Sequence, residues 1–109
     1  MTAEAIVVTT TAATRDEAER LTDLLLDSGL AACVQLSEID SHYRWNGETV
    51  REPETQLSIK TLRSLFPAIE AVVRAAHDYE TPQIIATLAT AVSDDYLAWI
   101  ETATGGDND

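Results

Sequence analysis

Cysteine, lysine and glycine are scarce in this chain of 109 residues, and each scarcity excludes a class of protein. Cys33 is the only cysteine, so the chain cannot form an internal disulfide, which favours a reducing compartment. A single thiol also excludes a multi-cysteine zinc or iron–sulfur site within one chain. Lys60 is the only lysine and the net charge is −12, so the surface repels phosphate backbones and we expect no nucleic-acid binding.

Long hydrophobic runs are absent as well. No apolar stretch approaches the ~20 residues that cross a membrane, and no basic segment followed by a hydrophobic one marks a signal peptide. We therefore expect a cytoplasmic protein that makes no contact with a membrane. Hydrophobic residues form 45% of the chain, which suits one globular domain. We place this domain at residues 1–103 and a disordered acidic tail at 104–109.

The excess of acidic residues, 19 against 7 basic ones, has two interpretations. It is typical of an ordinary soluble acidic protein. It is also typical of a halophilic protein, because concentrated salt shortens the range of repulsion between carboxylates to a few ångström. We favour the halophilic interpretation.

The chain is organised around a hairpin that runs from Gly29 to Thr61. Asn46-Gly47 predicts its turn, since a two-residue type I′ turn needs positive φ at both positions. The register set by this turn places Leu36 opposite Leu57 at the base of the hairpin, as part of one apolar face.

Nearer the tip, the apolar side chains fall on the opposite face, because side chains alternate along a strand. They are Ile39, Tyr43, Trp45 and Val50. A β-bulge between Leu36 and Ile39 would bring both sets onto one face. Without a bulge, a neighbouring subunit is the simplest cover for the tip, and we expect an oligomer.

Hydrophobic patterning on either side of the hairpin predicts two further strands and three helices. They are a strand at 4–11, a helix from 14 to 29, a helix from 64 to 77, a strand at 83–89 covered on both faces, and a last helix from 93 to 100. The order β-α-β-β-α-β-α predicts an α+β fold, the split ferredoxin-like β-α-β-β-α-β sandwich with an extra C-terminal helix.

Local signals mark the ends of these elements. Thr14 and Glu17 form a capping box at the start of the first helix, and Gly29 suits its C′ position. Ser64 is the expected cap of the second helix, and Pro67 falls in its first turn. Pro53 is expected to loosen the third strand or to place it at an edge.

No motif of a nucleophilic triad, a zinc protease or a phosphate-binding loop occurs, so we expect no enzymatic activity. The segment from His77 to Pro82 combines an imidazole with carboxylates, including Glu80, that suit a divalent cation such as copper or zinc. The simpler interpretation is a helix end at which a cationic histidine is favourable. Cys33 faces Lys60 across the hairpin, where an ammonium group would favour the metal-binding thiolate, although a buried apolar thiol is the commoner case.

Four aromatic residues are typical either of a small-molecule pocket between subunits or of the core of an interface. They are Tyr43, Trp45, Tyr79 and Trp99.

Five segments together resemble the CutA divalent-cation tolerance family, in the right order and spacing over residues 5–101. They are Gly29-Leu30-Ala31-Ala32-Cys33-Val34, Tyr43-Arg44-Trp45-Asn46-Gly47, Ile59-Lys60-Thr61, His77-Asp78-Tyr79-Glu80-Thr81-Pro82-Gln83-Ile84-Ile85 and Tyr96-Leu97-Ala98-Trp99-Ile100. The resemblance implies a homotrimer shaped like the PII signalling proteins, with long hairpins packed between subunits. It also implies tolerance of divalent cations, with copper bound by some members and no established enzymatic activity.

By this resemblance Cys33 and His77 are the first candidates for metal ligands, with Glu80 beside them. Two departures from the family pattern bear on the metal. Asp78 stands where the family usually has proline, and Thr9 to Thr11 stand where some bacterial members have a further cysteine. A copper site that depends on that thiol is absent here.

The sequence thus leaves three functions to compare. The first is a non-enzymatic trimer that binds copper or another divalent metal in ion homeostasis. The second is a PII-like regulatory module with a small metabolite in an inter-subunit cleft lined by Trp45, Lys60, Tyr79 and Glu80. The third, an acylphosphatase, requires a glycine-rich anion loop after the first strand, and residues 11–15 contain no glycine.

Overall fold

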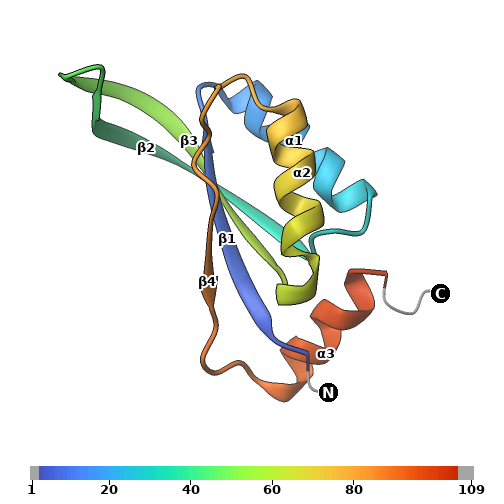
Figure 1. The fold of residues 1–109 in the computed structure, drawn as a ribbon. Coiled ribbons are helices and arrows are strands. Elements are labelled where there is room, and N and C mark those ends of the chain that lie inside the picture. The colour runs from blue at the N-terminus through green and yellow to red at the C-terminus, as the bar shows by residue number, and fades with distance from the viewer. Residues whose placement is uncertain (1–2, 106–109) are drawn as a thin grey trace.

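The computed structural model describes residues 3–105, and its element order confirms the predicted β-α-β-β-α-β-α pattern with one short 3₁₀ turn added (Figure 1). The elements are β1 (Ala5–Ala12), α1 (Arg15–Asp27), β2 (Cys33–Trp45), β3 (Glu48–Leu62), η1 (Arg63–Leu65), α2 (Phe66–Ala76), β4 (Ile85–Leu88) and α3 (Asp94–Ala103).

The strands form one antiparallel sheet in the order β2-β3-β1-β4. Helices α1 and α2 cover one face of it, and α3 lies at the end of the sheet away from the hairpin tip (Figure 1). This is the predicted α+β, ferredoxin-like sandwich with an additional C-terminal helix. The hairpin of β2 and β3 projects beyond the two layers, so the molecule is 46 Å long but only 22 to 26 Å across.

The core lies between the helices and the sheet, and alternation along β1 shows how it is built. Ile6, Val8, Thr10 and Ala12 are all buried, because every second side chain of a strand points to the same face. The buried apolar residues that meet them include Ala18, Leu21, Leu25, Leu57, Ile59, Ile69 and Val73. Full burial of one such leucine or isoleucine contributes about 1.5–3 kcal/mol.

The hairpin has the predicted turn and register. Asn46 and Gly47 both have positive φ, 52° and 81°, as a type I′ turn requires. The pairing runs without a bulge from Trp45 opposite Glu48 to Cys33 opposite Lys60. The apolar side chains of the tip therefore do face away from those of the base, and Trp45 is 50% exposed.

Pro53 does not loosen the third strand. It lies opposite Asp40 within unbroken pairing between β2 and β3. Pairing of β3 with β1 begins only at Thr55, so the part of β3 before it, which contains Pro53, has a neighbouring strand on one side only. Proline has no backbone N–H to donate, and it is tolerated at a sheet edge because no neighbour needs that donor. The alternative prediction, that Pro53 lies at an edge, therefore describes its position.

Two predictions about the second half of the chain were wrong. Ser64 does not cap α2, because it lies within the turn η1 and the N-cap is Leu65, although Pro67 does fall in the first turn. Strand β4 is not covered on both faces within one chain. It lies at the edge of the sheet, and Ile85 and Leu88 are 55% and 43% exposed.

The last helix begins after Ser93, as predicted, and ends at a buried residue. Thr104 donates a hydrogen bond to the carbonyl of Ile100, so the chain stays packed to this point. The rest of the predicted tail, apart from Gly105, lies outside the described residues. None of the helices in residues 3–105 is long and apolar enough to cross a membrane.

Candidate functional site

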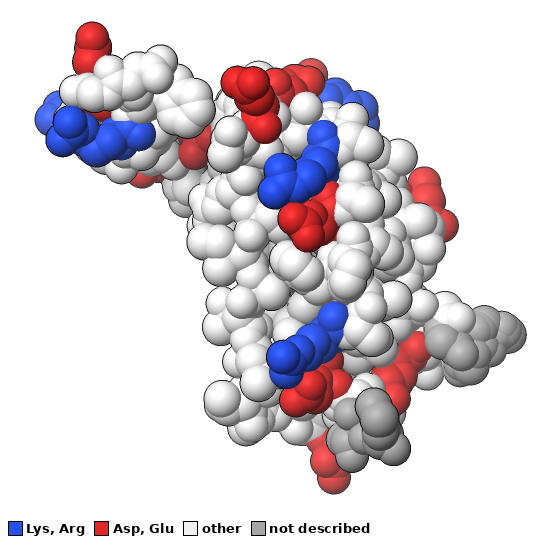
Figure 2. All heavy atoms as spheres, in the orientation of Figure 1, with Lys and Arg blue, Asp and Glu red and all other residues white. Residues whose placement is uncertain are grey.

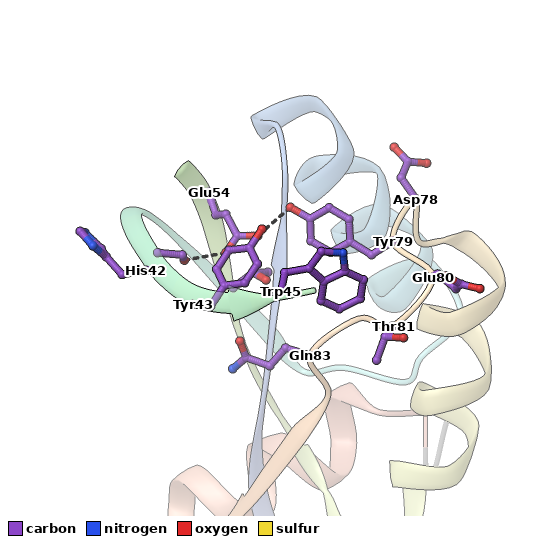
Figure 3. A pocket seen from close by; sticks show the side chains of 11 residues that line it. His42, Tyr43, Trp45, Glu54, Asp78, Tyr79, Glu80, Thr81 and Gln83 are labelled. Carbon is purple, nitrogen blue, oxygen red and sulfur yellow. Dashed lines mark hydrogen bonds between the residues drawn. The ribbon is translucent and has the colours of Figure 1, made fainter. Parts of the chain in front are cut away.

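An open pocket of about 630 Å³ lies where the hairpin tip meets the segment between α2 and β4 (Figure 3). The two elements supply aromatic, hydroxyl and carboxylate side chains. The lining residues are Thr11, Ser41, His42, Tyr43, Trp45, Glu54, Asp78, Tyr79, Glu80, Thr81 and Gln83.

Glu54 on β3 is the buried carboxylate of this pocket, only 7% exposed. One of its oxygens accepts a hydrogen bond from the hydroxyl of Ser41 and the other accepts one from the hydroxyl of Tyr79, both at 2.6 Å. Hydrogen bonds of this kind to a charged group are short and strong, so they offset the cost of burying the carboxylate. Glu54 therefore ties the hairpin to the segment that follows α2.

Both tyrosines of the pocket remain protonated at neutral pH. The hydroxyl of Tyr43 donates to Glu52 at 2.7 Å, and this bond, followed by desolvation, raises the pKa of Tyr43 to about 12. Burial, followed by the bond to Glu54, raises the pKa of Tyr79 well above its usual value. Both phenols therefore act as donors and leave the negative charge on the carboxylates.

His77 is placed at the C-cap of α2, as the helix-end interpretation expected, but its ring points inward and its side chain is fully buried. Its Nε2 lies 2.6 Å from the carbonyl oxygen of Thr11, so Nε2 carries the proton. Its Nδ1 accepts the backbone N–H of Tyr79 at 3.0 Å. Both ring nitrogens are thus engaged, and this arrangement leaves neither for a metal ion.

Glu17 helps to position the pocket, a role that the sequence did not predict. Half of the predicted capping box is present, since Thr14 Oγ1 accepts the N–H of Glu17 at 3.2 Å. The carboxylate of Glu17 is buried, and it accepts the backbone N–H groups of Ala13 at 3.3 Å and of Asp78 at 2.8 Å. The first helix thereby fixes the start of the segment that lines the pocket.

The predicted metal ligands do not come together within one chain. Cys33 lies opposite Lys60, which is opposite Val7 on β1, whereas His77 contacts Thr11 toward the other end of β1. Glu80 lines the pocket. Across residues 3–105, no three histidine, cysteine, aspartate or glutamate side chains are grouped so that they could hold a metal ion.

The predicted pocket residues are brought together in part. Tyr43, Trp45 and Tyr79 line the pocket. Lys60 does not, because it lies at the base of the hairpin beside Gln35. Trp99 is on α3, where its ring is 5.4 Å from that of Tyr96.

Comparison with known proteins identifies the family. The model of the CutA1 divalent ion tolerance protein family matches residues 6–103. The chain belongs to the CutA divalent-cation tolerance family. The divalent-cation tolerance protein CutA of Thermus thermophilus is 35% identical over 91% of this chain and 97% of its own. The periplasmic divalent cation tolerance protein CutA of Archaeoglobus fulgidus superposes with a TM-score of 0.90, at 32% identity over 92% of this chain and 98% of the other.

A plant relative of this CutA chain is longer. The chloroplastic protein CutA of Arabidopsis thaliana is 36% identical over 94% of this chain, but the match spans only 57% of the plant protein. Family membership supports a role in tolerance of divalent cations.

Proposed function

We propose that this CutA chain acts as a homotrimer in the tolerance of divalent cations, without catalysing a reaction. The observation that supports self-association is the apolar surface left uncovered in one chain, and the number of three copies is what the family resemblance implies. Trp45 on the hairpin, Ile85 and Leu88 on β4, and Trp99 on α3 are each more than 40% exposed. Within residues 3–105, both edge strands, β2 and β4, also have one side without a partner strand. Packing of copies against each other buries both features.

Copper, the metal we propose, has a sulfur ligand available in Cys33, which is free and partly exposed. His77 does not fit as a ligand in this conformation, because both of its ring nitrogens are engaged. A site at Cys33 therefore takes its remaining ligands from another copy of the chain.

The test is a calorimetric titration of chelator-stripped protein with Cu²⁺, on wild type and on the Cys33→Ser variant. Saturable binding at a fixed ratio per trimer that Cys33→Ser abolishes is the expected result. Asp23→Asn, which removes one exposed carboxylate from α1, is the control and should bind as wild type does. Weak, unsaturable binding in all three proteins would mean that carboxylates alone collect the metal, and light scattering that returns the mass of one chain would refute the trimer.

A second candidate, a PII-like regulatory module that holds a small metabolite, is favoured by the pocket at the hairpin tip. Three of the residues expected in such a cleft, Trp45, Tyr79 and Glu80, do line it. Ligand-induced shifts in melting temperature in the absence of metal would support this candidate over the first.

A further inference from the structure

We propose that arginine side chains of the hairpin tip form ion pairs with carboxylates of a neighbouring copy, so that charge as well as apolar contact holds the hairpin in the oligomer. The inference rests on the proposed function, because it requires that copies of the chain associate. It concerns the face of the hairpin tip opposite the aromatic residues. We call this the arginine face, and it consists of His42, Arg44 and Arg51.

The pairing of β2 with β3 brings these three residues together. His42 lies opposite Arg51, and Arg44 lies opposite Thr49, two positions nearer the turn. Paired residues share a face, and so do alternate residues along one strand. The three side chains therefore project from one face of the tip, whereas Tyr43, which alternates with His42 and Arg44, projects from the other. Contact through the aromatic face leaves the arginine face without a cover from its own chain.

Arg44 and Arg51 have no carboxylate beside them within residues 3–105. The other four arginines each lie within 3.8 Å of a carboxylate, and they are Arg15, Arg20, Arg63 and Arg74. In the same range of residues, the guanidinium of Arg44 donates only to the carbonyl of Gly47 in the turn, at 3.2 Å, and the exposed guanidinium of Arg51 has no partner. Figure 2 shows arginine side chains gathered at the hairpin tip.

The hairpin carries the arginine face away from the acidic body of its own chain. Strand β3 starts at Glu48 and pairs with β1 only from Thr55, so the two-stranded tip extends roughly 23 Å beyond the sheet at about 3.3 Å per residue. That length exceeds the Debye length of about 8 Å at physiological ionic strength. Of the nearer carboxylates on the same face, Glu38 pairs with Arg15 and Asp40 forms no ion pair in the described chain. The arginines are therefore available to a second molecule.

A second copy of this chain is the partner that fits. The chain has 19 acidic and 7 basic residues, so a neighbouring copy brings carboxylates in excess. Exposed carboxylates that form no ion pair in residues 3–105 lie on α1 and α3, and they are Asp16, Asp23, Asp27, Asp94, Asp95 and Glu101. A guanidinium binds a carboxylate through two parallel hydrogen bonds. The copy that covers the aromatic face is also close to the arginine face, because the tip is only two strands wide and neighbouring strands lie about 4.8 Å apart.

These ion pairs give the oligomer something that apolar contact alone does not. Chains with a net charge of −12 repel one another, most strongly in dilute solution. Arginines placed at the contact offset this repulsion locally. Charge complementarity also favours one arrangement of the copies over others, since a misplaced tip sets its arginines against no carboxylate. The arginine face thus selects the position of the hairpin on its neighbour.

The double variant Arg44→Gln/Arg51→Gln tests the proposal by removing both charges and keeping polar side chains. In dilute buffer its trimer should dissociate at a protein concentration about 10-fold or more above that of wild type, because three interfaces each lose two ion pairs. In molar KCl, where the Debye length is about 3 Å, the difference should shrink to about 3-fold or less. Light scattering on serial dilution measures both. Where the trimer persists at the lowest concentration, the rate of subunit exchange with isotope-labelled protein, followed by native mass spectrometry, gives the same comparison.

Two further double variants separate the position of the charges from the total charge. Arg63→Gln/Arg74→Gln changes the net charge equally but at ion pairs within one chain, so it should associate as wild type does. Arg44→Lys/Arg51→Lys keeps both charges at the tip and should also stay close to wild type. Equal association of wild type and Arg44→Gln/Arg51→Gln in dilute buffer, or an equal loss in either control, would overturn the proposal. Wild-type protein with the mass of one chain would instead refute the trimer of the proposed function.

Discussion

The carboxylate of Glu17 and the ring of His77 lie 3.5 Å apart, with both side chains almost completely buried. Since Nδ1 of His77 accepts the N–H of Tyr79 and its Nε2 donates to Thr11, the ring fits as a neutral group and the contact is not an ion pair. Glu17 instead uses its charge on the N–H groups of Ala13 and Asp78. Together the two residues fix the segment that carries Tyr79 into the pocket.

Replacement of Glu17 by alanine should therefore destabilise the fold and loosen the pocket. The change removes the charged acceptor of two backbone N–H groups, and a hydrogen bond to a charged group contributes about 1.5–3 kcal/mol. We expect urea unfolding to show a loss of roughly 2–4 kcal/mol. Glu19→Ala on the exposed face of the same helix, which breaks only the ion pair with Arg15, should cost less than about 1 kcal/mol. Equal losses in the two variants would contradict this role of Glu17.

The hairpin was predictable because its information is local. Asn46-Gly47 fixes the turn, the turn fixes the register, and the register determines which residues share a face. The turn and the register alone therefore predict that the base and the tip of the hairpin have their apolar side chains on opposite faces. The structure agrees, with Leu57 buried and Trp45 half exposed.

Glu17 and Ser64 show where local signals fail. A glutamate three residues after a capping threonine indicates a capping box. No sequence pattern indicates that its carboxylate accepts the N–H of Asp78, which is 61 positions later. Ser64 was a plausible cap, but the chain leaves β3 through a 3₁₀ turn and starts α2 at Phe66, which tertiary packing decides. Likewise the tyrosine–glutamate pairs of the pocket depend on how two distant segments meet.

Alkaline pH should destabilise the protein through Tyr79. Burial and the bond to Glu54 raise its pKa above the usual value of 10.0, so in the unfolded chain the phenol ionises first. Its contribution to stability is fully present below pH 10 and is lost as the pH rises from there toward the folded pKa. Urea midpoints measured across this range should fall less steeply in Tyr79→Phe than in wild type.

Tyr96→Phe is the matched control for this pH dependence. The ring of Tyr96 packs against the ring of Trp99, and its hydroxyl makes no hydrogen bond to the described residues. It should follow the wild-type curve. If Tyr79→Phe also followed that curve, the bond to Glu54 would contribute nothing to folding.

Salt should stabilise this protein, as the halophilic interpretation requires. Arg15, Arg20, Arg63 and Arg74 each lie within 3.8 Å of a carboxylate. Within residues 3–105, many of the other acidic side chains form no ion pair, and several lie on the face shown in Figure 2. Molar KCl screens their repulsion, and we expect the melting temperature to rise by about 5 °C or more over dilute buffer. An unchanged melting temperature would contradict the interpretation.

Asp27 allows this salt effect to be traced to one position. It occupies the last turn of α1, where a negative charge meets the negative end of the helix and no basic residue balances it. Asp27→Lys should stabilise the fold by about 0.5–1 kcal/mol in dilute buffer and by much less in molar KCl. An equal gain under both conditions would show that the effect is not electrostatic.

Two buried threonines on adjacent strands provide the sharpest test of the core. Thr10 and Thr61 are both 0% exposed, yet Thr61 donates to the carbonyl of Leu30 at 2.6 Å, whereas the hydroxyl of Thr10 has no partner among the described residues. Valine has the same shape as threonine without the hydroxyl. Thr10→Val should therefore raise the free energy of unfolding by about 1 kcal/mol, and Thr61→Val should lower it by about 1–3 kcal/mol, because the Leu30 carbonyl loses its donor. Denaturant unfolding of the two variants measures both signs, and a destabilised Thr10→Val would mean that its hydroxyl is bound by water or by another copy of the chain.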